Sequence, residues 1–353
     1  MSHRHTTRRQ FLKATAAAGV TSLAFPRVLT RARAASKNEL VFVGFGGSYQ
    51  DGQTKALFEP FEKETGIKVI QTTGVDIAKL RAQIQSKNVE WDLISIPDRL
   101  RYTAVKDGLL MPLSYTMINA KDVMPTLVTE YAVGCVTIPM LLTYSTKAYP
   151  AGKAPRTWMD FWDPKKFPGP RGLYNAPTYI LEFALIAAGA PKDKLYPLDV
   201  QRALKSLDRI KGDVKVWWSQ FPQPGVLLKS GEITMTPWTR SISFILEGEP
   251  LGISYDGAAL TYEAWVVPKG APNAENTMKF INWALQPKPQ AELTKYIAFG
   301  PTNLKAMPFV DPKLRPLLSS DPDNAKKGFL LSGDWWGPNL DKVNEQWNEW
   351  RLR

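Results

Sequence analysis

The sequence "LVFVGF" (residues 40–45) is an uninterrupted apolar run, and the turn "GGSYQDG" (residues 46–52) follows it directly. An apolar run without alternation is typical of a strand buried on both faces, as in a parallel sheet covered by helices. Apolar residues then recur at helical spacing over residues 57–66, and "IKVI" (residues 67–70) has the composition of a second strand. This opening predicts a strand–helix–strand unit.

The same alternation continues through the rest of the chain. Asp76 is placed to cap a helix over residues 77–84, and "WDLISI" (residues 91–96) predicts a third strand that stops at Pro97. Further strands are expected within residues 171–176, 233–238 and 260–268, and further helices within residues 180–189, 200–210 and 274–285, the last one capped by Asn273. Alternating strands and helices are the pattern of an α/β fold.

Residues 1–34 predict an export signal. They carry seven basic residues and no acidic one, and their apolar run is about half the ~20 residues that a membrane-spanning helix needs. "TRRQFLK" (residues 7–13) resembles the twin-arginine export motif, and Ala32-Arg33-Ala34 has the small-x-small pattern of a cleavage site. We therefore expect a periplasmic protein that is exported folded and cut after Ala34. The alternative is a basic disordered arm.

Removal of this signal changes the composition that bears on function. The remaining 38 basic and 33 acidic residues lower the net charge from +12 to +5, and no Lys/Arg run remains that indicates nucleic-acid binding. No histidine lies beyond His5, and the single cysteine, Cys135, sits in an apolar stretch that predicts a buried side chain. Histidine-dependent catalysis, histidine-bound metals and an intrachain disulfide are thereby excluded. We expect no catalytic residue, no metal and no cofactor.

Length and strand order together locate the expected binding site. The 319 residues after the signal exceed what one hydrophobic core normally supports, so two lobes are expected. Ligands of open α/β sheets bind outside the carboxyl ends of the strands. That rule points to residues 46–50, 97–99, 174–179 and 238–240. The glycines near residue 46 lack the spacing of a dinucleotide fingerprint, and we expect them to let the backbone approach a small ligand.

Seven segments spread over nearly the whole mature chain stand out by their order and spacing. They are "ALFEPFEKETGIKVIQTTG" (56–74), "WDLISIP" (91–97), "YSTKAYP" (144–150), "TWMDFWDPKKFPG" (157–169), "GEITMTPW" (231–238), "VVPKGAPNAENTMKFINWALQP" (266–287) and "FGPTN" (299–303). Together they resemble the periplasmic spermidine/putrescine-binding proteins of bacterial ABC importers. The resemblance implies an α/β, two-lobed periplasmic binding protein of type II, in which two crossing strands form a hinge and the lobes close over one solute.

The resemblance also implies a domain division and partners. Lobe 1 is expected to comprise residues 36–144 and 262–300. Lobe 2 is expected to comprise residues 145–261 and 301–353, including a C-terminal helical tail. The expected partners are a small-molecule solute and the permease subunits of an ABC transporter in the inner membrane. The protein is expected to act as a monomer.

The ligand-binding residues follow from the resemblance together with the strand-end loops. In polyamine binders an aromatic residue in the first loop, a tryptophan in a late strand and a carboxylate on a crossing strand embrace the ligand, and Tyr49, Trp238 and Glu263 match those positions. An ammonium group needs such aromatic faces and a carboxylate. The full expected set is Gly47, Ser48, Tyr49, Asp98, Arg99, Tyr179, Trp218, Ser219, Trp238, Arg240 and Glu263.

The chain departs from the polyamine pattern in its charges. Two acidic positions of that family fall on Ala176 and Tyr179, an aromatic position is occupied by Asp98 and Arg99, and Arg240 stands where glycine is frequent. A buried guanidinium needs a partner such as a carboxylate or phosphonate. Two alternatives remain open: Arg99 pairs with Asp98 or another acid, and Arg240 points to solvent.

These observations predict a periplasmic solute-binding protein that delivers a small amine-containing solute to an ABC permease. The solute is either polyamine-like or a zwitterionic amino-carboxylate. The alternatives are a receptor for an anionic solute (an organic acid or a phosphonate), a sensor or scaffold with the same fold, and a secreted enzyme without histidine.

Overall fold

The computed structural model describes residues 38–353, which belong to one compact unit of the chain. The predicted export signal, residues 1–34, lies outside the described residues. The fold is mixed α/β, as the alternating pattern predicts. Among the described residues, no helix combines the length and apolar character that crossing a membrane requires.

The strands form a single hydrogen-bonded sheet in the order β2-β1-β3-β8-β4-β7-β5-β6, with β9 attached to β4 and β10 to β8. Their bounds are β1 Glu39–Gly44, β2 Lys68–Thr73, β3 Leu93–Pro97, β4 Ala132–Ser145, β5 Arg171–Tyr174, β6 Val214–Trp218, β7 Met235–Trp238, β8 Leu251–Val266, β9 Gly300–Pro301 and β10 Phe329–Leu330.

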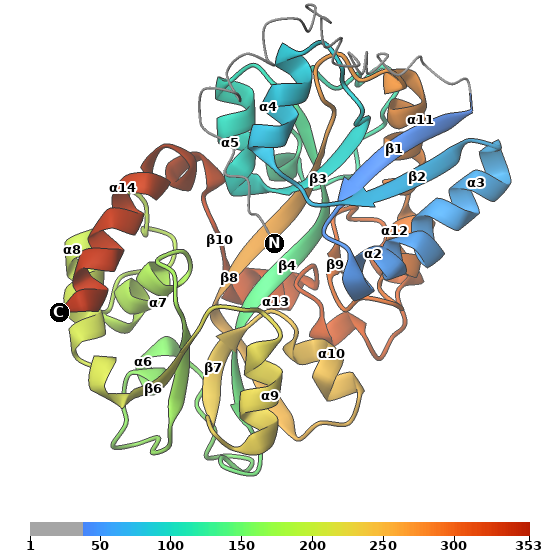
Figure 1. Ribbon diagram of the computed structural model, residues 1–353. Coiled ribbons are helices and arrows are strands. Elements are labelled where there is room, and N and C mark those ends of the chain that lie inside the picture. The colour runs from blue at the N-terminus through green and yellow to red at the C-terminus, as the bar shows by residue number, and fades with distance from the viewer. Residues whose placement is uncertain (1–37) are drawn as a thin grey trace, which may run out of the picture. The chain divides into compact units, whose positions relative to one another are not determined.

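Two long strands at the centre of the sheet, β4 and β8, connect its two parallel parts (Figure 1). They pair antiparallel from Ala132 opposite Val266 to Ser145 opposite Leu251. On one side of them β1 pairs parallel with β2 and β3, and on the other side β5 pairs parallel with β6 and β7. Each parallel part therefore presents the carboxyl ends of several strands at one edge.

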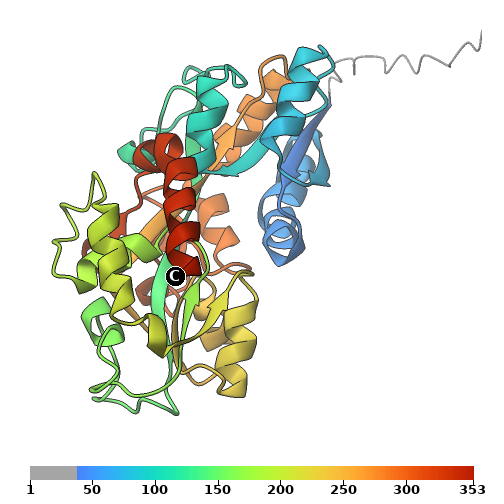
Figure 2. The ribbon, with the colours of Figure 1, turned by 60° about the vertical axis from the view of Figure 1, so that its left-hand side comes forward.

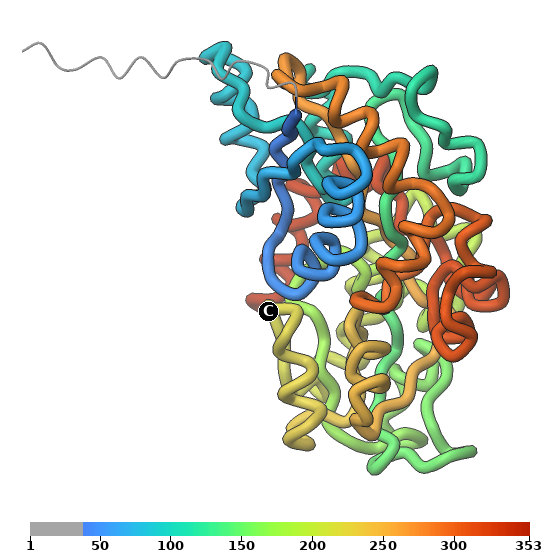
Figure 3. The backbone as a smooth tube through the Cα atoms, turned by 90° about the vertical axis from the view of Figure 1, so that its right-hand side faces the viewer, coloured from blue at the N-terminus to red at the C-terminus, as the bar shows by residue number. Residues whose placement is uncertain are grey.

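Helices follow most of the strands. Their bounds are α2 Gly47–Gln53, α3 Glu59–Thr65, α4 Ile77–Gln85, α5 Asp98–Lys106, α6 Trp158–Phe161, α7 Ile180–Ala187, α8 Val200–Asp208, α9 Gln223–Ser230, α10 Ser241–Leu246, α11 Ala274–Ala284, α12 Pro287–Leu293, α13 Pro322–Lys327 and α14 Gly333–Leu352. A π-helical segment, Thr54–Phe58, joins α2 to α3, so the three form consecutive coils in the backbone (Figure 3). Short 3₁₀ turns span Pro125–Leu127, Lys211–Asp213, Met307–Phe309 and Arg315–Leu317.

Buried side chains gather in two large clusters. The first draws on residues 40–136 and 262–297, and the second on residues 140–259 and 329–350. Both are rich in fully buried aromatic residues, such as Phe58 and Trp265 in the first and Trp158 and Trp336 in the second. Each such side chain contributes roughly 1.5–3 kcal/mol or more on burial. The strands β4 and β8 run through both clusters.

The C-terminal helix α14 belongs to the second cluster and also packs against α5 (Figure 2). At its first turns Gly333 and Gly337 lie against Asp98 and Tyr102 of α5, so closely that a Cβ atom at either glycine would overlap them. Farther along, Trp347 and Trp350 pack on the Trp217 ring at 5.9 and 5.8 Å between ring centroids. The expected C-terminal helical tail is thus present as α14.

A buried carboxyl group fixes α14 to α7. The indole Nε1 of Trp336 and the hydroxyl of Tyr196 both donate to Glu182 Oε1, at 2.6 and 2.8 Å. Glu182 is fully buried, and its Oε2 has no hydrogen-bond partner among residues 38–353. Burial raises the pKa of Glu182 to about 7, against the opposing effect of the two donors.

Several expected elements differ from the structure in extent. The glycine-rich turn at residues 46–52 was expected to be a loop, but a helix begins at Gly47, because Gly46 adopts φ 74° and turns the chain directly from β1 into α2. The strand expected at residues 260–268 is longer and spans Leu251–Val266. Asp76 caps α4 as predicted, by accepting from the backbone N–H groups of Ala78 and Lys79.

Asn273 precedes α11 but does not cap it with its side chain. Its Nδ2 donates instead to Asp92 Oδ2 at 3.0 Å, and its backbone N–H donates to Asp92 Oδ1 at 2.7 Å. Asn273 therefore stands at the predicted start of the helix, but its side-chain amide binds a buried carboxylate distant in sequence and makes no capping hydrogen bond.

Candidate functional site

Glu263 lies at the centre of the candidate site. It sits on β8, opposite Pro97 of β3 and Val136 of β4, with only 9% of its surface exposed. Its Oε2 is buried and has no hydrogen-bond partner among residues 38–353. Burial raises the pKa of Glu263 to about 8, and the charge of Arg99 opposes this rise. Glu263 is therefore a buried carboxyl group with an unfilled place for a donor.

Arg99, in the first turn of α5, faces the same site. It is half-buried, and its charge lowers the pKa of both Glu263 and Tyr179 from the values that burial alone would set. Arg99 forms no ion pair with an acidic residue in the described part of the chain. The guanidinium is thus close enough to influence two buried groups without being neutralised by direct pairing.

Asp98 faces elsewhere and has its own partners. Its Oδ1 accepts from Arg101 Nε at 2.7 Å and from the Tyr262 hydroxyl at 2.5 Å, and Arg101 also reaches Asp334 of α14. The alternative that Arg99 pairs with Asp98 is therefore wrong, since Arg101 takes that place. The sequence placed Asp98 among the ligand-binding residues, whereas the structure uses its carboxylate to join α5, β8 and α14.

Tyr49 of α2 lies near Glu263. Its ring meets Phe299 edge-on at 5.7 Å between centroids, and its hydroxyl lies 4.0 Å from Cys135 Sγ. Cys135 in turn donates to the backbone carbonyl of Glu263 at 3.3 Å. Burial raises the pKa of both Tyr49 and Cys135, and the nearby Glu263 adds to the rise. Cys135 is buried, as the sequence predicts, and its thiol is held in the un-ionised form.

Tyr179 enters the site with a strained backbone. It precedes α7 with φ 72° and ψ −44°, a combination that costs a residue with a side chain of order 1–3 kcal/mol. The side chain is buried, which raises its pKa to about 12, while Arg99 acts in the opposite direction. Strain of this kind persists only where surrounding contacts impose it, and it gathers at functional sites.

Two predicted tryptophans lie beneath the site surface. Trp218 and Trp238 are buried, and their indole N–H groups donate to Thr236 Oγ1 at 2.8 Å and to the Phe221 carbonyl at 2.7 Å. Phe221, by contrast, is 38% exposed and contacts Trp218 at 5.8 Å between centroids. The tryptophans thus support a more accessible aromatic surface.

Tyr174 and Phe221 form that accessible surface. Tyr174 ends β5, and its ring lies 4.7 Å from Trp218 and 5.4 Å from Phe221. The strand-end rule pointed to residues 174–179 and so included Tyr174, although Tyr174 was not among the expected ligand-binding residues. Phe221 carried no signal in the sequence alone.

Ser48 and Arg240 join the two parallel parts of the sheet. Ser48 stands in the first turn of α2, after β1, and Arg240 follows β7 and precedes α10. The Nη2 of Arg240 donates to Ser48 Oγ at 3.1 Å. Arg240 is thus partly exposed, and its side chain also makes a hydrogen bond across the sheet. Arg240 is in no ion pair with an acidic residue among residues 38–353.

The remaining two predicted residues are exposed. Gly47 begins α2 with φ 61°, and Ser219 follows β6, where its backbone N–H donates to Gln223 Oε1 at 2.8 Å. Among the described residues, no group of three His, Cys, Asp or Glu side chains is placed to hold a metal ion.

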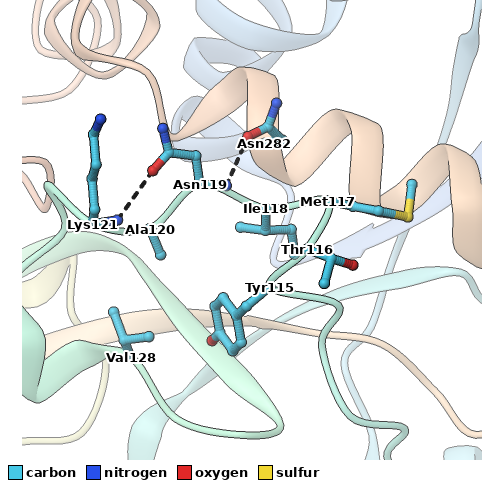
Figure 4. A pocket seen from close by; sticks show the side chains of 9 residues that line it. All are labelled: Tyr115, Thr116, Met117, Ile118, Asn119, Ala120, Lys121, Val128 and Asn282. Atoms are coloured by element: carbon cyan, nitrogen blue, oxygen red, sulfur yellow. Dashed lines mark hydrogen bonds between the residues drawn. The ribbon is translucent and has the colours of Figure 1, made fainter.

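A pocket of about 630 Å³ lies elsewhere, along residues 115–121 (Figure 4). Asn282 Oδ1 accepts from the backbone N–H of Asn119 at 2.9 Å, and Val128 completes the wall. Lys121 is the charged residue that lines it, and none of the predicted site residues does. The pocket lacks the converging carboxyl and guanidinium groups found around Glu263, so it is not the candidate solute site.

Known proteins resemble the chain over nearly its whole described length. A family model of bacterial extracellular solute-binding proteins matches residues 56–325. The gamma-aminobutyric acid-binding protein of Pseudomonas aeruginosa is 30% identical over 342 residues, which cover 93% of this chain and 95% of that protein.

Solved structures show the same relationship. The binding protein AgtB of A. tumefaciens R10, in complex with agropinic acid, is 41% identical, with a TM-score of 0.75 over 90% of this chain and 100% of that one. An ABC transporter substrate-binding protein of Bradyrhizobium japonicum USDA 110 is 36% identical, with a TM-score of 0.84 over 89% of this chain and 99% of that one. The periplasmic binding protein fold and the resemblance predicted from the sequence are confirmed.

These family matches exclude the predicted alternative of a secreted enzyme. The chain belongs to the bacterial extracellular solute-binding proteins and is a non-enzymatic, periplasmic or extracellular solute-binding protein of an ABC transporter.

Proposed function

We propose that the protein captures a small zwitterionic amino-carboxylate and presents it to the permease of its ABC transporter. The observation that supports this most directly is the charge pattern of the site. Glu263 is a buried carboxyl group that lacks a donor, while Arg99 and Arg240 are guanidinium groups without an acidic ion-pair partner among residues 38–353. A solute with one ammonium and one carboxylate group provides a donor for Glu263 and an anionic partner for an arginine.

The ammonium group of the solute is expected at Glu263. Oε2 offers an acceptor in a buried environment, where a charged hydrogen bond is strong. Tyr49 supplies an aromatic ring beside it, and a cation over such a ring gains about 0.5–2 kcal/mol. A doubly charged polyamine fits less well, because the positive charge of Arg99 opposes a second ammonium group here.

The carboxylate group of the solute is expected at Arg240. Its guanidinium presents several N–H donors in one plane, of which Nη2 meets only the neutral Ser48 hydroxyl. A carboxylate there forms charge-assisted hydrogen bonds, which are about twice as strong as neutral ones. The purely anionic alternative, an organic acid or a phosphonate, uses the arginines but leaves Glu263 without a partner.

The named ligand of one relative agrees with this class. The Pseudomonas aeruginosa relative is named for gamma-aminobutyric acid, which carries one ammonium and one carboxylate group. The A. tumefaciens structure holds an acid, agropinic acid, which agrees with the proposed carboxylate position alone. We propose the charge pattern of gamma-aminobutyric acid for the solute of this chain.

Binding is measured by isothermal titration of the mature protein with 4-aminobutyrate, putrescine and succinate. The proposal predicts that 4-aminobutyrate, which carries both charges, binds more tightly than either single-charge-type probe. Tighter binding of succinate would support the anionic alternative, and tighter binding of putrescine would support a polyamine receptor. Either result would overturn the amino-carboxylate proposal.

We also propose that the two hydrophobic clusters are the cores of two lobes, with the boundaries predicted above, and that β4 and β8 form the hinge between them. A monomer that closes in this way has a smaller radius of gyration with bound solute. Small-angle X-ray scattering with and without solute measures this change. An unchanged radius, or a dimer in both states, contradicts the proposal.

Export through the twin-arginine pathway is proposed from the motif at residues 7–13. Replacing Arg8 and Arg9 together by lysine is expected to leave the precursor in the cytoplasm. The readout is the ratio of precursor to mature protein in cytoplasmic and periplasmic fractions. A normal periplasmic yield of the double variant would show that another pathway carries the protein.

A further inference from the structure

The surroundings of Glu263 leave its negative charge poorly compensated before a solute arrives. Glu263 lies on β8, which is flanked by β3 and β4, its side chain is buried, and no donor reaches its Oε2 from residues 38–353. An ionised carboxylate in such a place is costly unless it is paired, and a group in this position keeps its proton instead.

The groups that face Glu263 come from four elements. They are Tyr49 of α2, Arg99 of α5, Cys135 of β4 and Tyr179 at the start of α7. Only Arg99 is a cation, and it forms no ion pair with Glu263. Tyr49, Cys135 and Tyr179 remain neutral because burial raises the pKa of each. The neighbouring acid, Asp98, is occupied by Arg101 and Tyr262.

An ammonium group changes this balance. It brings both the missing donor and a full positive charge to Oε2, and both favour the ionised carboxylate. The solute amine arrives already protonated. The Glu263 proton therefore does not pass to the solute but leaves to bulk water, so that a neutral carboxyl group and an ammonium ion become an ion pair and one free proton.

We propose that capture of the solute's ammonium group expels a proton from Glu263, so that solute binding by this protein is linked to pH. This inference rests on the proposed function, because it needs an amine at Glu263. It adds a regulatory consequence: the protein holds its solute less tightly in an acidic periplasm, where the proton competes with the ammonium ion for the same carboxylate.

The size of the effect follows from the pKa of about 8 that burial gives Glu263. At pH 7 about nine-tenths of the free protein carries the proton, so binding releases about 0.9 proton per solute. The dissociation constant is expected to fall about tenfold between pH 6 and pH 7, and to become nearly constant above about pH 9.

Isothermal titration of the mature protein with 4-aminobutyrate tests the inference. Titrations at pH 7 in phosphate and in Tris, whose ionisation enthalpies differ, give the number of protons released. About one is expected for the wild type and none for Glu263→Gln, which keeps the shape but cannot ionise. Arg209→Ala, which removes an exposed arginine at the end of α8 that is not among the candidate site residues, is the control and keeps the release.

The outcomes separate this inference from the function on which it rests. Binding of 4-aminobutyrate without proton release overturns the inference and leaves the proposed function standing. Absence of binding by both 4-aminobutyrate and putrescine overturns the proposed function. In that case a pH titration of the Glu263 carboxyl ¹³C resonance in the free protein tests the inference, with the resonance assigned by comparison with Glu263→Gln. A titration midpoint near the ordinary glutamate pKa of about 4.3 overturns the inference.

Discussion

Arg240 donates to Ser48 over a separation of 192 residues, with 3.1 Å between Nη2 and Oγ. Ser48 follows β1 and Arg240 follows β7, so this one hydrogen bond links the two parallel parts of the sheet at their carboxyl ends. A guanidinium that donates one N–H group to a neutral hydroxyl has further N–H groups available to bind an anion. The same pair therefore stands where a solute carboxylate can bridge both parts.

Replacing Arg240 by alanine is expected to weaken an amino-carboxylate far more than a diamine. A hydrogen bond to a charged group contributes roughly 1.5–3 kcal/mol, which corresponds to about 10- to 150-fold in Kd. Isothermal titration of Arg240→Ala with 4-aminobutyrate and putrescine measures the two effects, with Arg209→Ala as control. Equal weakening of both ligands would show that Arg240 acts on closure and not on the carboxylate.

Replacing Arg99 by alanine is expected to move the pH dependence of binding to higher pH. The charge of Arg99 opposes the rise that burial causes in the pKa of Glu263. Without Arg99 the pKa of Glu263 is therefore expected to rise further. The Glu263 proton is then held more tightly, and affinity for an amine reaches its plateau only at a higher pH. Isothermal titrations with 4-aminobutyrate between pH 6 and pH 10 give the midpoint of the pH dependence of affinity for the wild type and for Arg99→Ala. A midpoint that moves to lower pH would mean that Arg99 does not face Glu263.

Glu182 predicts a separate pH effect, on stability. Its folded-state pKa of about 7 lies above the ordinary value, so the folded chain binds this proton more tightly than the unfolded chain. Stability from this group is present below about pH 4.5 and is lost as the pH rises through about 7, by roughly 3 kcal/mol in all.

Denaturant unfolding at pH 5 and pH 8 measures the Glu182 effect. In Glu182→Gln the free energy of unfolding is expected to differ much less between the two pH values. The glutamine amide oxygen can still accept from Trp336 and Tyr196, and the side chain carries no charge at either pH. Glu345→Gln, an exposed acid on α14, serves as control and keeps the wild-type difference. The same difference in wild type and Glu182→Gln would contradict the assignment.

Trp238 is expected to govern stability and to act on binding only indirectly. Trp238→Phe keeps most of the packing but leaves the Phe221 carbonyl without its donor, which costs about 1–3 kcal/mol. Thermal unfolding measures the loss, and titration of the folded variant measures affinity. Unchanged stability with lost binding would instead support the direct ligand contact that the sequence predicts for Trp238.

Local patterns in the sequence predicted much of this fold. The apolar runs at β1 and β3 and the cap at Asp76 depend on neighbouring residues alone, and they emerged correctly. The central strand β4 was not predicted, because it contains Gly134 and Pro139, which ordinarily mark breaks. Pairing with β8 along almost its whole length overrides that local preference.

The site was harder to predict because residues distant in sequence determine which charged side chains pair with one another. Asp98 and Arg99 are adjacent, and only the position of Arg101 one helical turn later, together with Tyr262 on β8, decides which arginine Asp98 binds. Glu263 and Tyr49 came from the family resemblance, and the structure brings them together. Phe221 could not be predicted, because its accessibility follows from the burial of Trp218 and Trp238, which only the folded structure shows.

The chain contains one cysteine, and it is inaccessible: Cys135 lies beneath Tyr49 with its thiol hydrogen-bonded to the Glu263 carbonyl. Burial also raises its pKa, so little thiolate is available to react. A cysteine introduced on the surface is therefore the single reactive thiol of the folded protein. Attachment of an environment-sensitive dye near Phe221 would turn the protein into a fluorescent reporter of its solute, without first removing a native residue.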